Sequence, residues 1–277
     1  QKVARAWSRS SRLSGGRARE PDKMTLRNVI LLAPSGLVLF AKEYGQAVAQ
    51  PRLLGSLLTA MTEFATQTTA MHPTYIEMSS MAITMVRDEV ARVSCALVHD
   101  RNDTASFGRL IACEILLAFV EEYSGDGAPL GGRAQHLKDF HGFGAMIGPV
   151  VKQSVRSVLH RLGSDGRVLH TALISEDNVD QSGGAEIDQL SLLAASKYLF
   201  MSADRILDYE RDAPTLHMSF DDDGDETRTL LWRVGDCVLM VCVIKSGDPA
   251  KDALVYDECL LCRSLIAQVL RQSRALR

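Results

Sequence analysis

The stretch LRNVILLAPSGLVLFAKEYG, Leu26 to Gly45, contains two apolar segments separated by the four residues Ala33-Pro34-Ser35-Gly36. Proline at the second position and glycine at the fourth position fit a tight type I turn. The sequence therefore predicts a β-hairpin at the start of the fold. A lone hairpin is marginally stable, so we expect further strands or a helix to cover it.

The segments that follow the hairpin show a helical pattern, then strand patterns, then a second helical pattern. A helix is predicted for residues 50–71, where one apolar face is made by Leu53, Leu54, Leu57, Leu58, Met61 and Phe64. Short strands are predicted for 75–78, 81–86 and 91–99, and an amphipathic helix within 106–123. This order of elements predicts an α+β domain, a five-stranded antiparallel sheet with helices on it.

The second half of the chain gives a related pattern in a different order. Helices are predicted for 147–162, 186–210 and from Pro249 onward, and strands for 167–177, 215–220, 228–235 and 237–245. A weaker strand is expected near 179–185, which is polar and rich in glycine. These elements predict a second five-stranded antiparallel sheet with helices.

A stretch rich in glycine and proline, residues 125–132, marks the boundary between the two predicted domains. The expected organisation is a disordered basic tail over 1–23, a first domain over 24–124, a linker over 125–144 and a second domain over 145–277. The Arg- and Ser-rich tail has transit-peptide composition, but we favour a disordered tail or a translation artefact over a working targeting signal.

The charge balance argues against a nucleic-acid ligand. The formal net charge is −3, and residues 1–23 carry seven Lys or Arg and two acids. The rest of the chain therefore has 24 basic and 32 acidic residues, and this mild acidity is a poor basis for nonspecific nucleic-acid binding. No apolar run approaches the length of a membrane-spanning helix.

Catalytic motifs are not evident, so we expect no enzyme, no cofactor and no metal site. Cys259 and Cys262 form a single CxxC within a helical pattern, which favours buried, reduced thiols of a cytosolic protein over a redox or zinc site. Residues 127–133 depart from the phosphate-loop pattern, and the acidic run Asp221 to Glu226 is interpreted as a solvated hairpin turn. An enzyme on an unfamiliar α+β fold is the least favoured hypothesis.

Two resemblances combine these observations. The hairpin, the strand GLVLFAKEYG, the helix PRLLGSLLTAMTEF and the helix ending FVEEY resemble a longin domain over residues 24–124. The segments SVLHRLGSDGRVLHTALISED, LLAASKYLFMSADRIL and LLWRVGDCVLMVCVIKSGD resemble the roadblock family of dynein light chains over residues 145–277. The polar stretch 179–185 departs from the roadblock pattern, so that strand is either short and exposed or paired differently.

The resemblances imply a non-enzymatic adaptor or scaffold. It would form a homo- or heterodimer with a longin or roadblock subunit and bind a small Ras-like GTPase in membrane traffic or ciliary transport. It would be cytoplasmic, with peripheral association to endomembranes through partners, or located at the cilium. The alternative is a structural or cargo-linking subunit of a dynein or ciliary complex.

Partner-binding residues are implied by the roadblock resemblance. In that family the strand after the central helix pairs with its equivalent in the partner, and the central helices pack beside it. The matching elements are Thr215–Phe220 and Ile187–Leu207, and the candidate contact residues are Leu199, Phe200, Leu216, Met218 and Phe220. The alternative is that these side chains face the core of their own domain.

Overall fold

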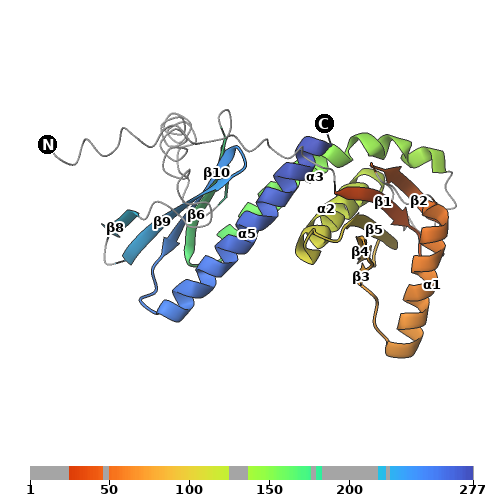
Figure 1. The fold of residues 1–277 in the computed structure, drawn as a ribbon, viewed down its shortest axis with the longest axis horizontal. Helices are drawn as coiled ribbons and strands as arrows, with labels where there is room; N and C mark the ends of the chain where they lie inside the picture. Colours follow the sequence, from red (N-terminus) through yellow and green to blue (C-terminus); the bar gives the residue numbers. More distant parts are fainter. Residues whose placement is uncertain are drawn as a thin grey trace.

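The computed structural model describes residues 25–45, 50–124, 137–175, 179–182, 218–222 and 225–276. The basic tail 1–23, the glycine-rich stretch 127–133 and the predicted helix 186–210 lie outside the described residues. Within the described parts, the chain is an α+β protein with two antiparallel sheets and several helices, which confirms the predicted fold class (Figure 1).

The first sheet has five strands in the order β2-β1-β5-β4-β3. Their bounds are β1 Leu26–Leu32, β2 Val38–Glu43, β3 Tyr75–Glu77, β4 Met81–Asp88 and β5 Val93–Asp100. The predicted hairpin is confirmed, because the Gly36 amide donates to the Ala33 carbonyl oxygen at 2.9 Å. Gly36 has φ +82°, and a Cβ there would lie 2.8 Å from Thr59 Oγ1 of the following helix. Both facts explain glycine at this turn position.

Two helices cover the two faces of this sheet: α1 (Pro51–Thr69) and α2 (Ala105–Tyr123). Side chains alternate along β1, so Val29 and Leu31 lie in the core cluster that contains α2. Ile30 and Leu32 lie in a separate cluster with α1. The Thr104 hydroxyl caps α2 by accepting from an amide in its first turn at 3.1 Å.

The second sheet has the strand order β7-β6-β10-β9-β8, with antiparallel pairing throughout. The bounds are β6 Val168–Ile174, β7 Val179–Ser182, β8 Met218–Asp222, β9 Asp225–Val234 and β10 Cys237–Ile244. Two alternatives were left open for residues 179–185, a short strand or a different pairing. Strand β7 is short and pairs with β6. In each sheet the strand that comes last in the chain, β5 or β10, lies at the centre. The first two strands lie on one side of it and the third and fourth on the other.

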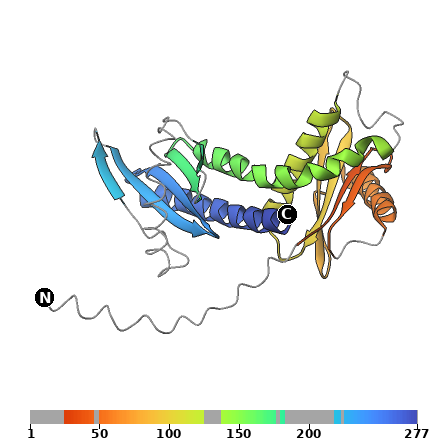
Figure 2. The same cartoon turned by 90° about the horizontal axis from the view of Figure 1, so that it is seen from above.

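Three further helical elements connect the sheets: the 3₁₀ helix η3 (Leu137–Ala145), α3 (Ile147–Gly163) and α5 (Pro249–Ala275). Helices α3 and α5 lie side by side and run from the second sheet to α2 (Figure 2). One hydrophobic cluster includes residues of both sheets and of α2, α3 and α5. Phe140 and Phe143, within the stretch predicted as a linker, are buried in that cluster. The two halves thus share a core.

Polar contacts reinforce this shared core at the end of α5. The Gln272 side chain bonds the Thr25 hydroxyl, and the Thr104 amide donates to Gln268 Oε1 at 3.4 Å. Both glutamines are buried. The last turns of α5 are therefore fixed to the loop ends of the first sheet, although the rest of this helix lies on the second sheet.

Among the helices that the structure describes, none has the length and apolar character needed to span a bilayer.

Candidate functional site

One side of α1 carries large apolar side chains that the sheet does not cover. The exposed fractions are 64% for Leu53, 48% for Leu57, 38% for Met61 and 69% for Phe64. These four residues recur every three or four positions and therefore align along one face of the helix; we call them the α1 stripe. Of the six residues in the apolar face predicted from the sequence, these four are thus exposed, and only Leu54 and Leu58 are buried.

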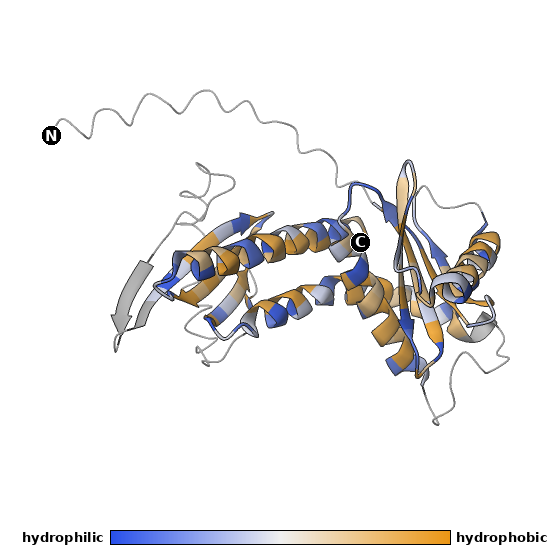
Figure 3. Cartoon of the chain, turned by 90° about the horizontal axis from the view of Figure 1, so that it is seen from below, coloured by the Kyte–Doolittle hydropathy of each residue, from blue (hydrophilic) through white to orange (hydrophobic). Residues whose placement is uncertain are grey.

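The position of α1 explains why the stripe stays exposed. Leu54 and Leu58 face the sheet, and the stripe lies next to them around the helix because adjacent residues are about 100° apart. Helix α1 lies at the end of the molecule away from the second sheet (Figure 1). Hydrophobic residues follow its length there (Figure 3). Contiguous exposed apolar surface of this kind marks an interaction site.

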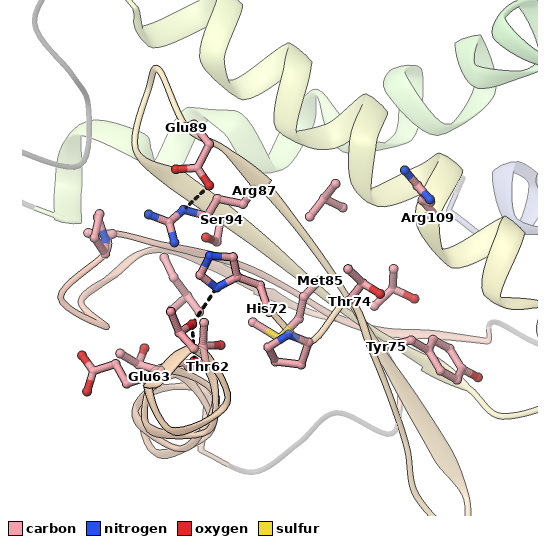
Figure 4. Close-up of a pocket in the computed structure, with 18 of the residues that line it drawn as sticks. Thr62, Glu63, His72, Thr74, Tyr75, Met85, Arg87, Glu89, Ser94 and Arg109 are labelled. Atoms are coloured by element: carbon pink, nitrogen blue, oxygen red, sulfur yellow. Dashed lines mark hydrogen bonds and ion pairs between the residues drawn. The ribbon is translucent and has the colours of Figure 1, made fainter. Parts of the chain in front are cut away.

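A cavity of 590 Å³ opens beside α1 (Figure 4). It is lined by the polar side of α1, by residues 72–75 that lead into β3, and by the end of β4. His72 Nδ1 lies 2.9 Å from Thr66 Oγ1 of α1, and Arg87 Nε lies 3.1 Å from Glu89 Oε1. Met85 of β4 adds an apolar surface. The Arg87 and Glu89 side chains pair with each other, and Glu63 and Arg109 also line the cavity.

The same cavity borders an open strand edge. Strand β3 pairs only with Ala82–Thr84 of β4, and the Met85 amide donates to the Thr74 carbonyl oxygen at 2.8 Å. Among the described residues, β4 has no partner on this side beyond Met85. Hydrogen-bonding direction alternates along a strand, so Arg87 directs its amide and carbonyl toward the open side. An open edge is a template for another extended chain.

The partner-binding residues predicted in the second half are only partly described. Met218 and Phe220 lie on β8, which is an edge strand of its sheet. Leu199, Phe200 and Leu216 lie outside the described residues. The two sheets have the same strand order, so β3 of the first sheet corresponds to β8 of the second. Helix α1 precedes β3 in the chain and therefore corresponds in chain position to residues 183–217, which precede β8. Sequence periodicity identified α1 but gave no sign that four of the six residues in its apolar face are exposed.

A buried polar cluster lies on the other face of the first sheet. His99 is fully buried, with Nδ1 3.0 Å from the Asp100 carbonyl oxygen and Nε2 3.0 Å from Thr84 Oγ1. Nδ1 therefore donates and Nε2 accepts, as in a neutral imidazole. Asp103 Oδ2 lies 4.0 Å from Nδ1. Thr84 lines the cavity beside α1, whereas His99 and Asp103 do not.

Burial of this cluster predicts a pH-dependent stability. Burial lowers the pKa of His99 below 6.5, although the neighbouring Asp103 and Asp100 carboxylates favour the charged form. The unfolded chain then takes up the proton first, so the free energy of unfolding falls as the pH drops below 6.5. Burial raises the pKa of Asp103, although the charge of Arg271 lowers it. The raised pKa of Asp103 makes the free energy of unfolding rise as the pH drops, which is opposite to the effect of His99. We expect His99→Gln to show a shallower acid loss than wild type, by up to about 1.4 kcal/mol per pH unit.

Urea unfolding at pH 7.5, 6.5 and 5.5 measures this difference directly. The exposed His160→Gln is the matched control and should keep the wild-type dependence. Equal dependence in His99→Gln and wild type would show that His99 does not remain neutral through this range.

Three of the six cysteines, Cys95, Cys259 and Cys262, are buried, and the other three are partly exposed. All six are free, and burial raises the pKa of Cys259 to about 12 and that of Cys262 to about 11. The CxxC is therefore not a thiolate site near neutral pH, as the helical context indicated. Asp221 and Asp222 of β8 pair with Glu226 and Asp225 of β9 in antiparallel fashion, which agrees with the interpretation of this acidic run as a hairpin; residues 223 and 224 lie outside the described residues.

Within the described ranges, no group of three or more His, Cys, Asp or Glu side chains is arranged to hold a metal ion. The α1 stripe, the adjacent cavity and the open edge of β4 remain the best candidate for a functional surface. Comparison of the chain with models of known protein families gives no match, and no curated protein matches it either.

Proposed function

We propose that this protein is a non-enzymatic adaptor or scaffold that docks other polypeptides through the first half of the chain. The observation that carries the proposal is the α1 stripe, four large apolar side chains that are 38% to 69% exposed along a single helix. The open edge of β4 borders the cavity on the polar side of α1 and offers main-chain hydrogen bonds. The stripe is thus an apolar surface for a partner, and the edge is a separate template for an extended segment.

The strand order supports a tandem of a longin-like and a roadblock-like domain within this proposal. Both sheets follow one pattern, β2-β1-β5-β4-β3 and β7-β6-β10-β9-β8. The helices are placed differently, since α1 and α2 follow strands of the first sheet whereas α3 precedes the second. A small Ras-like GTPase is the partner that these resemblances suggest, and its contact would be made by docking rather than by chemistry from this chain.

Two substitutions on the stripe should remove partner binding. Leu57→Glu and Phe64→Glu place carboxylates on an apolar surface that must lose water on binding, so we expect at least a tenfold weaker association for each. Affinity capture from native lysate, with GDP and separately with a non-hydrolysable GTP analogue, measures the recovered proteins by mass spectrometry. We expect a GTPase that is recovered in one nucleotide state by wild type and lost in both variants.

Leu254→Glu on α5 is the matched control, because Leu254 is 65% exposed and lies away from the stripe. It introduces the same charge and should recover the wild-type set of partners. If the stripe variants recover the same proteins as wild type and as Leu254→Glu, then α1 is not a docking surface.

A further inference from the structure

We infer that the outer edge of β2 receives an extended, acidic segment of a partner polypeptide, which pairs with β2 as an additional strand. The inference rests on the proposed docking function and names the chemistry of the partner segment. Three features of the first half carry it: the direction of the main-chain groups of β2, a cavity beside this strand, and the charges that line the cavity.

Strand β2 is unpaired on its outer side. Among the described residues it pairs only with β1, because it lies at the end of the strand order. The Tyr44 amide donates to the Arg27 carbonyl oxygen at 2.7 Å, so Ala41 and Glu43 direct their main-chain groups away from β1. Both residues are exposed. An antiparallel segment can therefore form about four main-chain hydrogen bonds here, whereas the open part of β4 offers half as many, at Arg87.

A cavity of 660 Å³ borders this edge and leaves room for the added segment. It is lined by residues 38–41 of β2, by residues 50–53 at the start of α1 and by His141 of η3. The first turn of α1 lies beside β2 (Figure 1). Most of the lining side chains are apolar. A strand added to β2 would thus lie between α1 and η3, with its side chains directed alternately to the two walls.

The same cavity joins the edge of β2 to the α1 stripe. Leu53 is the first residue of the stripe, is 64% exposed and lines this cavity. None of the stripe residues lines the cavity that borders β4. A partner strand on β2 can therefore continue onto the stripe in one interface, whereas the edge of β4 lies on the other side of α1.

The ionisable groups of the cavity favour an acidic segment. Arg52 and His141 are the only ionisable residues that line it, and both are exposed. No Asp or Glu lies among the lining residues. A carboxylate of the partner would therefore meet a guanidinium group and an imidazole here, without a competing carboxylate from this chain. Charge complementarity of this kind fixes the register of a segment more than it adds affinity.

The alternation of side chains along β2 places that carboxylate. Ala41 pairs with Ile30 of β1, whose side chain lies in the cluster with α1, so Ala41 and Glu43 both face the α1 side. A partner residue opposite Ala41 points to the same side, where Arg52 and Leu53 line the cavity. A carboxylate opposite Glu43 would be repelled. The acidic residue is therefore expected opposite Ala41, with an apolar residue opposite Glu43.

Isothermal titration calorimetry of the full chain with synthetic peptides tests the inference. The probe is an acetylated, amidated heptapeptide of sequence TLTETLT, which puts one Glu and two Leu on the same face of a strand. We expect a micromolar dissociation constant, and about fivefold weaker binding of TLTKTLT. Arg52→Glu should reverse this preference. The matched control Lys152→Glu, at an exposed position of α3, should keep it.

Backbone methylation of the same peptide tests strand pairing without changing the protein. In the expected register the amides of the Leu and Glu residues point to β2, and those of the Thr residues point away. N-methylation of the Leu and Glu amides should abolish binding, whereas N-methylation of the inner Thr amides should leave it within about threefold. Circular dichroism should show an unchanged fold for both charge variants, because both substituted residues are exposed.

Three results would overturn the inference: no binding of TLTETLT at millimolar concentration, equal binding of the two N-methylated peptides, or an unchanged charge preference in Arg52→Glu. A wild type that sediments as a dimer and does not bind the peptide would assign the β2 edge to a second copy instead. If the peptide does not bind but Leu57→Glu still loses its partners in lysate, the docking function stands and only the β2 edge is excluded from it.

Discussion

Replacing Phe119 with alanine is expected to lower the free energy of unfolding by about 3 to 5 kcal/mol. Phe119 of α2 is fully buried, and its ring centroid lies 4.9 Å from that of Tyr123 and 5.1 Å from those of Phe140 and Phe143. Phe143 in turn contacts Phe40 of β2 in an edge-to-face arrangement at 5.4 Å. Removal of Phe119 leaves a cavity at the point where α2, η3 and the first sheet meet.

Urea unfolding followed by far-UV circular dichroism measures the loss. Leu117→Ala is the control on the same helix, because Leu117 is 53% exposed and should cost no more than about 0.5 kcal/mol. A loss below about 1 kcal/mol for Phe119→Ala would mean that η3 repacks into the space and that the aromatic cluster does not fix it to α2.

Gly108→Ala is expected to lower the free energy of unfolding by about 3 kcal/mol, although alanine is the better helix former. A Cβ at this position would lie 2.3 Å from Thr84 Oγ1 and 2.6 Å from His99 Nε2. Both side chains are buried and bond each other at 3.0 Å. The added methyl group must therefore displace α2 from the sheet or break that bond in a place where water cannot replace it.

Gly148→Ala in α3 separates this close contact from helix propensity. A Cβ at Gly148 would meet nothing within 4 Å, so this variant should gain about 0.5 kcal/mol in the same urea unfolding experiment. The double variant Gly108→Ala/Thr84→Ala should be less destabilised than the sum of its parts, because the nearest atom has been removed. Additive losses would contradict the proposed contact between α2 and β4.

The local elements of the fold were accessible from the sequence. The turn at Ala33–Gly36 is set by proline and glycine, and the alternation of apolar residues in β1 assigns its two faces. Helix α5 begins at Pro249, as predicted, and the Asp248 side chain caps it by accepting from the Ala250 amide at 3.0 Å. These features depend on neighbours within a few residues, and the sequence displays those neighbours directly.

The candidate site was less accessible. The sequence showed that Leu53 and Leu54 both belong to the apolar side of α1, but burial of one and exposure of the other depends on which side of the helix meets the sheet. The open edge of β4 was also hidden, because it results from a β3 that is shorter than its neighbour. The roadblock resemblance instead places the partner-binding residues on the predicted helix 187–207, which lies outside the described residues, and on the predicted strand 215–220, of which β8 is described.

The sequence alone determined the α+β class, the order of the strands and the absence of recognisable catalytic motifs, because each follows from local periodicity and turn chemistry. Only the tertiary structure decided that the two halves share one hydrophobic cluster, that residues 179–182 pair with β6, and that the α1 stripe faces outward. The physical reason is that burial and strand pairing are contacts between residues distant in the chain. An apolar side chain tends to be buried, but whether another helix or strand covers it depends on how the whole chain packs.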